Sequence, residues 1–228
     1  MANILAGRSK VILSFLLLFG PAFILIFIST RSCDHKFQVL EDYGTVKQVP
    51  FEVLGQTKKH TFNDYKGDIL IVTTLQKTCP GDCAISFWHL NQLLYQNIRK
   101  NKTKKMKRIR MISFGTDGKG NPLPLNQLEE IKEAIIDNVE EYDPEIWILA
   151  TGDVQKVYNF RHNGANLLAK GNKYYGGHAF QELILLLDKE GHLRMVLRGT
   201  QEGLIRKMKD YTALLQKQYD KENKKNQK

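Results

Sequence analysis

Cysteine is scarce in this chain, with three among 228 residues. Three are too few for a fold held together by disulfides, so stability must come from an apolar core. Internal repeats are absent, and the only low-complexity segment is the lysine-rich C-terminal end. Since 42% of the residues are apolar and 10% aromatic, we expect a folded core. The length suits one membrane anchor and one domain of ordinary size.

Two features that would indicate nucleotide or nucleic-acid binding are also missing. The glycine-rich stretch Gly115 to Gly120 lacks the Lys-Ser/Thr ending of a phosphate-binding loop. The net charge is +10, and much of the excess lies in Lys100 to Arg110 and Lys217 to Lys228. No aromatic residues are interleaved with the first basic run, as a base-stacking surface would need. We therefore expect a solvated loop there and no nucleic-acid partner.

A long apolar run is present near the N-terminus. Val11 to Thr30 contains no charged residue over twenty positions, enough for a helix to cross a bilayer of about 30 Å. A cleaved signal peptide would have a shorter apolar region, and Arg31 shortly before Cys33 argues against a lipoprotein signal. We predict an uncleaved anchor. Positive residues before the span weakly favour an exported domain.

The rest of the chain is typical of an α/β domain with a mixed central sheet. Short β-branched runs after turn residues predict strands, and apolar residues at intervals of three and four predict helices. Asp188 to Gly191 predicts a hairpin turn with Gly191 at positive φ. After a first strand at 49–54, the expected order is β-α-β-α-β-α-β-β-α. The predicted strands are 49–54, 68–75, 109–114, 146–150, 183–187 and 193–197, and the predicted helices are 83–98, 125–141, 154–160 and 202–219.

Two cysteines stand four apart in Thr78-Cys79-Pro80-Gly81-Asp82-Cys83, between a predicted strand and a predicted helix. On the first turn of a helix, such a pair would project to the same face. The unpaired N–H groups of a helix N-terminus favour thiolates. Cys79 and Cys83 are therefore predicted either to form a disulfide or to hold a soft metal together.

His178 is the histidine that we single out from the six in the chain. It follows Gly176-Gly177, and two glycines let the backbone approach another part of the fold closely. His89, His162 and His192 have no comparable context. From spacing alone, a functional role for His178 and an ordinary surface position are equally compatible with the sequence.

These motifs together resemble the Sco/SenC family of copper chaperones, which are thioredoxin-fold proteins with an N-terminal anchor. Cys79, Pro80 and Cys83 match the family's C-P-x-x-C pair, and His178 matches its third copper ligand. Asp188 with Gly191 matches the turn after the strand that follows this His. Trp147 to Gly152 (WILATG) is similar to the family's tryptophan-containing strand. The similarity spans about Val49 to Leu215.

The sequence departs from the family around the motif. Ala84 replaces a Pro, Thr74 to Lys77 replaces an aromatic-rich strand, and Gly177 and Ala179 replace the Asp and Ser beside the His. Gly115 to Gly118 replaces an Asp-Pro-x-x-Asp segment. No ligand is removed by these changes, but they affect the surroundings of the site and the choice of partner.

Two functions remain open on this pattern. Two thiolates and one imidazole suit Cu(I), and the resemblance implies a metallochaperone that delivers copper to a respiratory cytochrome c oxidase. A membrane-anchored thiol–disulfide oxidoreductase would use Cys79 and Cys83 without needing His178, although such enzymes more often have two residues between the cysteines. A peroxidase is disfavoured because Gln76 stands where its Thr should be. The predicted location is the cell inner membrane, with the domain on the periplasmic side.

The predicted organisation along the chain has five parts. They are a short N-terminal segment 1–10, a transmembrane anchor 11–30, a linker 31–48, a thioredoxin-like domain 49–216 and a charged tail 217–228.

Overall fold

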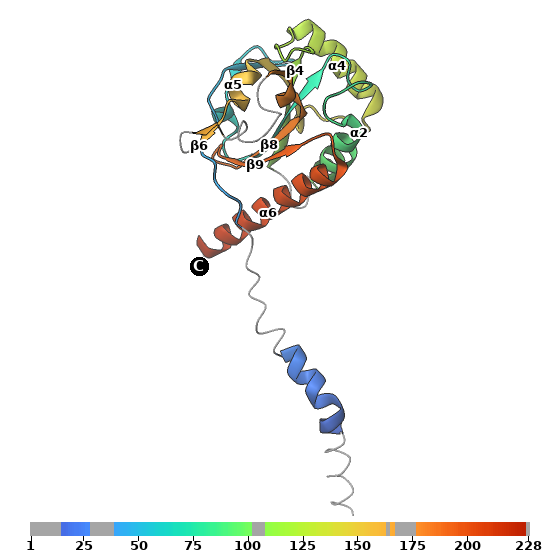
Figure 1. Ribbon diagram of the computed structural model, residues 1–228, viewed down its shortest axis with the longest axis vertical. Coiled ribbons are helices and arrows are strands. Elements are labelled where there is room, and N and C mark those ends of the chain that lie inside the picture. Colours follow the sequence, from blue (N-terminus) through green and yellow to red (C-terminus); the bar gives the residue numbers. More distant parts are fainter. Residues whose placement is uncertain (1–14, 28–38, 102–107, 163–164, 167–176, 227–228) are drawn as a thin grey trace, which may run out of the picture. The chain divides into compact units, whose positions relative to one another are not determined.

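The computed structural model describes residues 15–27, 39–101, 108–162, 165–166 and 177–226, without the side chains of residues 161–179 and 223–226. The chain divides into two units, Met1–Gln38 and Val39–Lys228. Residues 15–27 of the first unit are helical (Figure 1). The ends of the predicted anchor Val11–Thr30, and Cys33, lie outside the described residues. Within the described ranges no helix combines the length and the hydropathy that a membrane crossing needs. The anchor therefore stays a prediction.

A mixed sheet forms the centre of the second unit, as the sequence predicts. Its strand order is β2-β1-β5-β4-β3-β8-β9. β3, β4 and β5 are parallel to one another, whereas β8 pairs antiparallel with both β3 and β9. A separate ribbon pairs β6 with β7. The strands are β1 (Phe51–Val53), β2 (Lys59–His60), β3 (Ile69–Gln76), β4 (Ile109–Thr116), β5 (Trp147–Gly152), β6 (Arg161–His162), β7 (Ala165–Asn166), β8 (Leu183–Leu187) and β9 (Leu193–Arg198).

Helices cover both faces of the sheet, with α5 on the side opposite to α2 and α4 (Figure 1). Every residue of β3 is buried, and its side chains alternate between two apolar clusters. Ile69 and Ile71 pack with η2, α4 and α6, whereas Leu70 and Val72 pack with η1 and α5. The helical segments are η1 (Phe62–Tyr65), α2 (Phe87–His89), the π-helical η2 (Leu90–Tyr95), α3 (Gln96–Asn101), α4 (Leu125–Asn138), α5 (Val154–Tyr158), η3 (Gly177–Glu182) and α6 (Glu202–Asn226).

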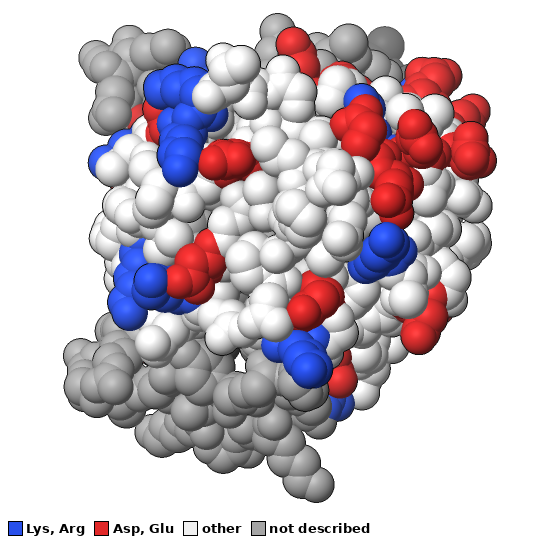
Figure 2. Space-filling view, turned by 90° about the horizontal axis from the view of Figure 1, so that it is seen from above, with Lys and Arg blue, Asp and Glu red and all other residues white. Residues whose placement is uncertain are grey.

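All four predicted helices differ in extent from the prediction, and α5 ends at Tyr158 instead of position 160. The helix after the cysteines begins at Phe87 instead of Cys83. α4 ends at Asn138 because Val139 adopts an extended conformation. α6 continues to Asn226, into the segment expected as a charged tail. Most of the basic run 100–110 lies outside the described residues. In Figure 2, the lysines and arginines of the face shown form small groups among acidic residues and a broad uncharged area.

Part of the predicted linker packs on the β8–β9 hairpin. Tyr43 N–H donates to the carbonyl of Leu193 (2.9 Å), and Val46 is 2% exposed. The predicted hairpin itself is confirmed, with Gly191 at φ 86°. Residues 39–48 thus contribute both hydrogen bonds and apolar contacts to the domain.

An ion pair holds this segment to the hairpin turn. Asp42 Oδ2 lies 2.8 Å from His192 Nδ1 and 3.4 Å from an Arg194 guanidinium nitrogen. The hydrogen bond to Asp42 raises the pKa of His192, and partial burial opposes this effect without cancelling it. Burial alone would raise the pKa of Asp42, but the bonds from His192 and from the Gly44 N–H lower it. The charged pair is therefore favoured in the folded state.

We expect the His192–Asp42 pair to stabilise the domain over a limited pH range. The His192 contribution is complete below the unfolded pKa of about 6.5 and is lost as pH rises through the higher folded value. The Asp42 contribution is present above about pH 4 and is lost as pH falls through its lowered folded pKa. Both groups are partly exposed, so His192→Ala should lower the free energy of unfolding by at most about 1 kcal/mol near pH 6.

Urea unfolding at pH 6 and pH 9 measures this effect. The difference between the wild type and His192→Ala should shrink at pH 9. Asp42→Ala should show at least the same loss at pH 6, because Asp42 also accepts the Gly44 N–H, and adding His192→Ala to it should cause no further loss. An equal difference at both pH values would contradict the proposed ion pair.

Candidate thiol and metal site

The two predicted cysteines form a disulfide at the carboxyl end of the central strand. β3 ends at Gln76, and the loop 77–86 then connects it to α2. Cys79 and Cys83 are bonded within this loop, with their Cα atoms 5.0 Å apart. The disulfide is one of the two possibilities that the spacing left open. The expected position on the first turn of a helix is wrong, because both cysteines precede the helix.

Contacts with other segments explain why this loop is not helical. Ser86 N–H donates to the carbonyl of Gly199 (2.9 Å), just beyond β9, and Ala84 N–H donates to the side-chain oxygen of Gln76 (2.9 Å). The first helical bond then runs from Leu90 N–H to the Ser86 carbonyl. The backbone N–H groups of Ala84 and Ser86 are thus committed to distant partners.

Gly199 allows a close approach of two segments beside the disulfide loop. A Cβ at this position would lie 2.6 Å from Ile85 Cγ2, a distance that real contacts do not reach. Gly199 N–H also donates to the carbonyl of Glu182 at the end of η3 (2.7 Å). One glycine therefore joins the cysteine loop, β9 and η3.

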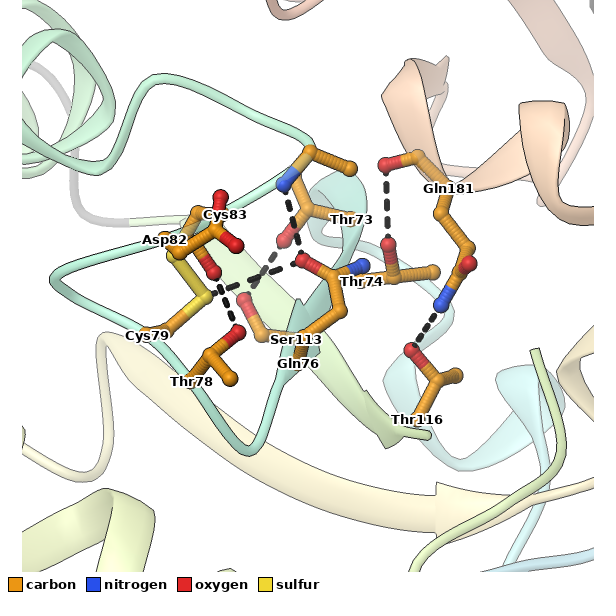
Figure 3. The surroundings of a disulfide bond; sticks show 11 residues. Thr73, Thr74, Gln76, Thr78, Cys79, Asp82, Cys83, Ser113, Thr116 and Gln181 are labelled. Atoms are coloured by element: carbon orange, nitrogen blue, oxygen red, sulfur yellow. Dashed lines mark hydrogen bonds between the residues drawn. A yellow bond between two sulfur atoms is a disulfide. The ribbon is translucent and has the colours of Figure 1, made fainter. Parts of the chain in front are cut away.

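Gln76 lies next to the disulfide and is 8% exposed. Its Oε1 accepts the Ala84 N–H and lies 3.7 Å from Cys79 Sγ. Because the backbone donor requires an acceptor, the orientation of the amide is determined. Its Nε2 is buried without a hydrogen-bond partner among the described residues. Figure 3 shows the amide oxygen toward the disulfide loop and the nitrogen turned toward the side where Thr74 and Gln181 lie.

The two sulfur-bearing residues differ in accessibility. Cys79 is only 5% exposed, whereas Cys83 is intermediate between buried and exposed. Thr78 and Asp82, which flank the turn, are exposed, and the Thr78 hydroxyl donates to the Asp82 carbonyl. Cys83 is therefore the side of the disulfide that faces solvent.

The strand topology brings η3 to the same edge of the sheet. β8 runs antiparallel to β3, with Leu185 opposite Val72, so the residues before β8 lie beside the carboxyl end of β3. Gln181 anchors this segment, since its carbonyl accepts the Thr74 hydroxyl (3.0 Å). Its Nε2 donates to Thr116 Oγ1 (2.6 Å) at the end of β4.

His178 occupies the first turn of η3, three residues before Gln181. Its side chain lies outside the described residues. Among the side chains that are described, no three His, Cys, Asp or Glu residues form a group able to hold a metal ion. His89 Nδ1 lies 2.7 Å from Ser86 Oγ, and its Nε2 lies 3.4 Å from a Glu202 carboxylate oxygen.

Trp147, which marks the family-like strand, has a structural role. It is fully buried, and its indole N–H donates to Ser113 Oγ (2.8 Å). Its ring packs near Phe87 and Tyr95, with centroids 5.7 and 5.3 Å away. Since Phe87 begins α2, Trp147 supports the helix that follows the cysteine loop.

Gln76 and Gln181 are the site residues that sequence reasoning missed. The sequence marks Gln76 as standing where a peroxidase has Thr and as part of the Thr74 to Lys77 departure from the family, without indicating a role at the site. Its position at the end of a buried apolar strand was a usable signal, because a buried amide needs partners. Gln181 offered no such signal, since its partners Thr74 and Thr116 are distant in sequence.

Comparisons with known proteins place this architecture among thioredoxin-like structures. No family model matches the chain, and no curated protein matches it. A Sco1/SenC family lipoprotein from Bacillus anthracis matches with a TM-score of 0.50 and 16% identity, over 76% of this chain and 95% of that one. BsSco, a member of the Sco family of cytochrome c oxidase assembly proteins, has the same TM-score and identity, over 78% and 98%.

A protein of Aquifex aeolicus VF5 with a suggested role in electron transfer matches at a TM-score of 0.50 and 15% identity, over 77% and 98%. At these identities the matches establish a shared fold. The thioredoxin-like fold predicted from the sequence is confirmed, and solved Sco proteins are among the structures that share it.

The close packing at Gly199 leads to a testable prediction. Gly199→Ala should destabilise the domain by about 1–3 kcal/mol, because the new methyl group overlaps Ile85. Chemical unfolding of the oxidised protein measures this loss. Gly203→Ala is the control, since a Cβ there meets nothing within 4 Å. Unchanged stability in Gly199→Ala would show that the loop moves freely relative to β9.

Proposed function

We propose that this protein handles copper and thiols in the manner of the Sco/SenC proteins whose fold it shares. In this proposal, Cys79, Cys83 and His178 bind one copper ion as cargo and pass it to a copper site of a respiratory cytochrome c oxidase. The observation that carries the proposal is the pairing of Cys79 with Cys83 at the carboxyl end of β3, beside the helix that contains His178.

The donor set supports copper as the cargo. In the reduced state, two thiols in one short loop can offer two thiolates to one ion, and binding then releases both thiol protons. Thiolate and imidazole ligands favour Cu(I), and low coordination leaves a position open for transfer to a recipient. Gln181 supports the third ligand by fixing η3 to the ends of β3 and β4.

A thiol–disulfide exchange function is the second candidate, and the disulfide itself favours it. Cys79 and Cys83 reach each other without a metal, and Cys83 is accessible to a partner. The two functions are compatible, because a copper site built from cysteines must be reduced before it is loaded. The His178 side chain distinguishes them, since exchange does not need an imidazole.

The proposed location is the outer face of the inner membrane, with Val11 to Thr30 as the anchor. Disulfides persist in oxidising compartments such as the bacterial periplasm. The Sco1/SenC match from Bacillus anthracis is a lipoprotein, which is also tethered to a membrane. Cys33, just after the predicted anchor, is not assigned a role.

The copper proposal is tested by anaerobic titration of the reduced protein with Cu(I) in competition with a chromogenic chelator. We expect one ion per chain, with affinity reduced at least about 100-fold in Cys79→Ser, Cys83→Ser and His178→Ala. His192→Ala is the matched control, because His192 belongs to the hairpin turn.

Disulfide exchange of His178→Ala with glutathione should stay within about twofold of the wild type, because thiol exchange depends on the two sulfurs and on access to them. Unchanged copper affinity in His178→Ala would remove this residue from the ligand set. If the protein binds no stoichiometric copper but its disulfide exchanges rapidly, the copper function is contradicted and the oxidoreductase function remains.

The anchor proposal is tested by washing membranes with alkaline carbonate. The full chain should stay in the membrane pellet, whereas a chain beginning at Val39 should be released, because the second unit forms its own core. Replacing Leu17 and Ile24 with Lys should also release the full chain, since each Lys near the centre of a span costs about 3 kcal/mol. Retention of all three proteins would contradict the anchor.

A further inference from the structure

We propose that Cys83 forms the mixed disulfide with a partner protein. Cys79, which is buried against Gln76, then attacks Cys83 and forms the internal disulfide. The inference rests on the proposed thiol chemistry of the site, but it concerns which sulfur does what and not whether copper binds.

Accessibility is the first argument. Cys79 is 5% exposed, so an incoming protein thiol or disulfide would have to displace packed residues to reach its sulfur. Cys83 is partly exposed and follows the exposed residues Gly81 and Asp82. Because exchange requires the attacking sulfur to approach along the S–S axis, access selects among the sulfurs. Cys83 is therefore the cysteine that a partner can reach.

The Gln76 amide is the second argument. Its Oε1 faces Cys79 Sγ at 3.7 Å and is held there by the Ala84 N–H. When the pair is reduced, this oxygen can accept the Cys79 S–H. Cys83 has no side-chain acceptor among the described residues. Gln76 thus acts as a positioning residue that keeps Cys79 inward until Cys83 has reacted.

The exchange reaction balances with a partner disulfide as the oxidant. The Cys83 thiolate attacks one partner sulfur, the partner S–S bond breaks, and its second cysteine leaves as a thiolate that takes a proton from water. Cys79 then loses its proton to solvent and attacks Cys83 Sγ. The Cys79–Cys83 bond forms, the mixed disulfide breaks, and the first partner cysteine leaves. Two electrons pass to the partner.

Single-cysteine proteins test the order directly. In full-length protein carrying Cys33→Ser, we compare Cys79→Ser, which leaves Cys83, with Cys83→Ser, which leaves Cys79. The Cys79→Ser variant should react with Ellman's reagent, and form a mixed disulfide with oxidised glutathione, at least about 10-fold faster than the Cys83→Ser variant. Equal rates, or a faster Cys83→Ser, would overturn the proposal.

A second measurement covers the case in which a serine variant fails to fold. The reduced protein with both cysteines and Cys33→Ser is labelled briefly with iodoacetamide, and peptide masses show which cysteine is modified first. Cys83 should carry at least about 10 times more label than Cys79 at early times. Predominant labelling of Cys79 would overturn the order.

The role of Gln76 is tested by the ratio of the two labels. Gln76→Met removes the acceptor at similar length and should raise the Cys79 share severalfold, whereas Gln76→Glu retains an oxygen and adds a negative charge that disfavours the Cys79 thiolate, so it should not raise that share. Gly199→Ala disturbs the same loop without removing Oε1. If it changes the ratio as Gln76→Met does, Gln76 has only a structural role.

These outcomes are independent of the copper proposal. Rapid labelling of Cys79 together with tight copper binding would overturn the order and leave the copper function standing. Labelling of Cys83 first in a protein that binds no copper would support the order of reaction and contradict the copper function.

Discussion

The burial of β3 on both faces and along both edges is the constraint on which the site depends. Its side chains alternate between two apolar clusters, and its backbone pairs with β4 on one edge and β8 on the other. A strand held in this way has a fixed end point. The loop that begins after Gln76 therefore starts from a rigid position, and loops on rigid scaffolds are where reactive groups are commonly placed.

Polar side chains at the end of this strand connect the segments around the disulfide. Thr74 and Gln76 have buried hydrogen-bonding groups that cannot reach bulk water, so each needs a partner nearby. Thr74 binds the backbone of η3, and Gln76 binds the backbone of the cysteine loop. Among the described residues the Nε2 of Gln76 has no hydrogen-bond partner, and its N–H donors lie on the side of Thr74 and Gln181. The site thus combines fixed surroundings with one accessible sulfur.

Sequence reasoning worked where the signal was local. Nearly continuous apolar runs predicted β3, β4 and β8, because strands buried on both faces are rich in apolar residues. Asp188 and Gly191 predicted the hairpin turn, since the glycine conformation is a local requirement. Sequence reasoning failed at Cys83, because the spacing of apolar residues suggested that the helix begins there, whereas α2 begins at Phe87. The N–H groups of Ala84 and Ser86 bind Gln76 and Gly199 instead, and no local pattern reveals such distant partners.

The sequence by itself determined the alternation of strands and helices, the pair Cys79 and Cys83, and the turn that joins β8 to β9. Those features depend on residues within a few positions of one another. Only the tertiary structure decided that the cysteines lie in a loop, that Cys79 is buried while Cys83 is accessible, and that Gln76 lies against Cys79. Burial and hydrogen bonding at the site arise from segments as distant as Thr74 and Gln181, 107 positions apart, or Ser86 and Gly199, which meet only when the sheet is assembled.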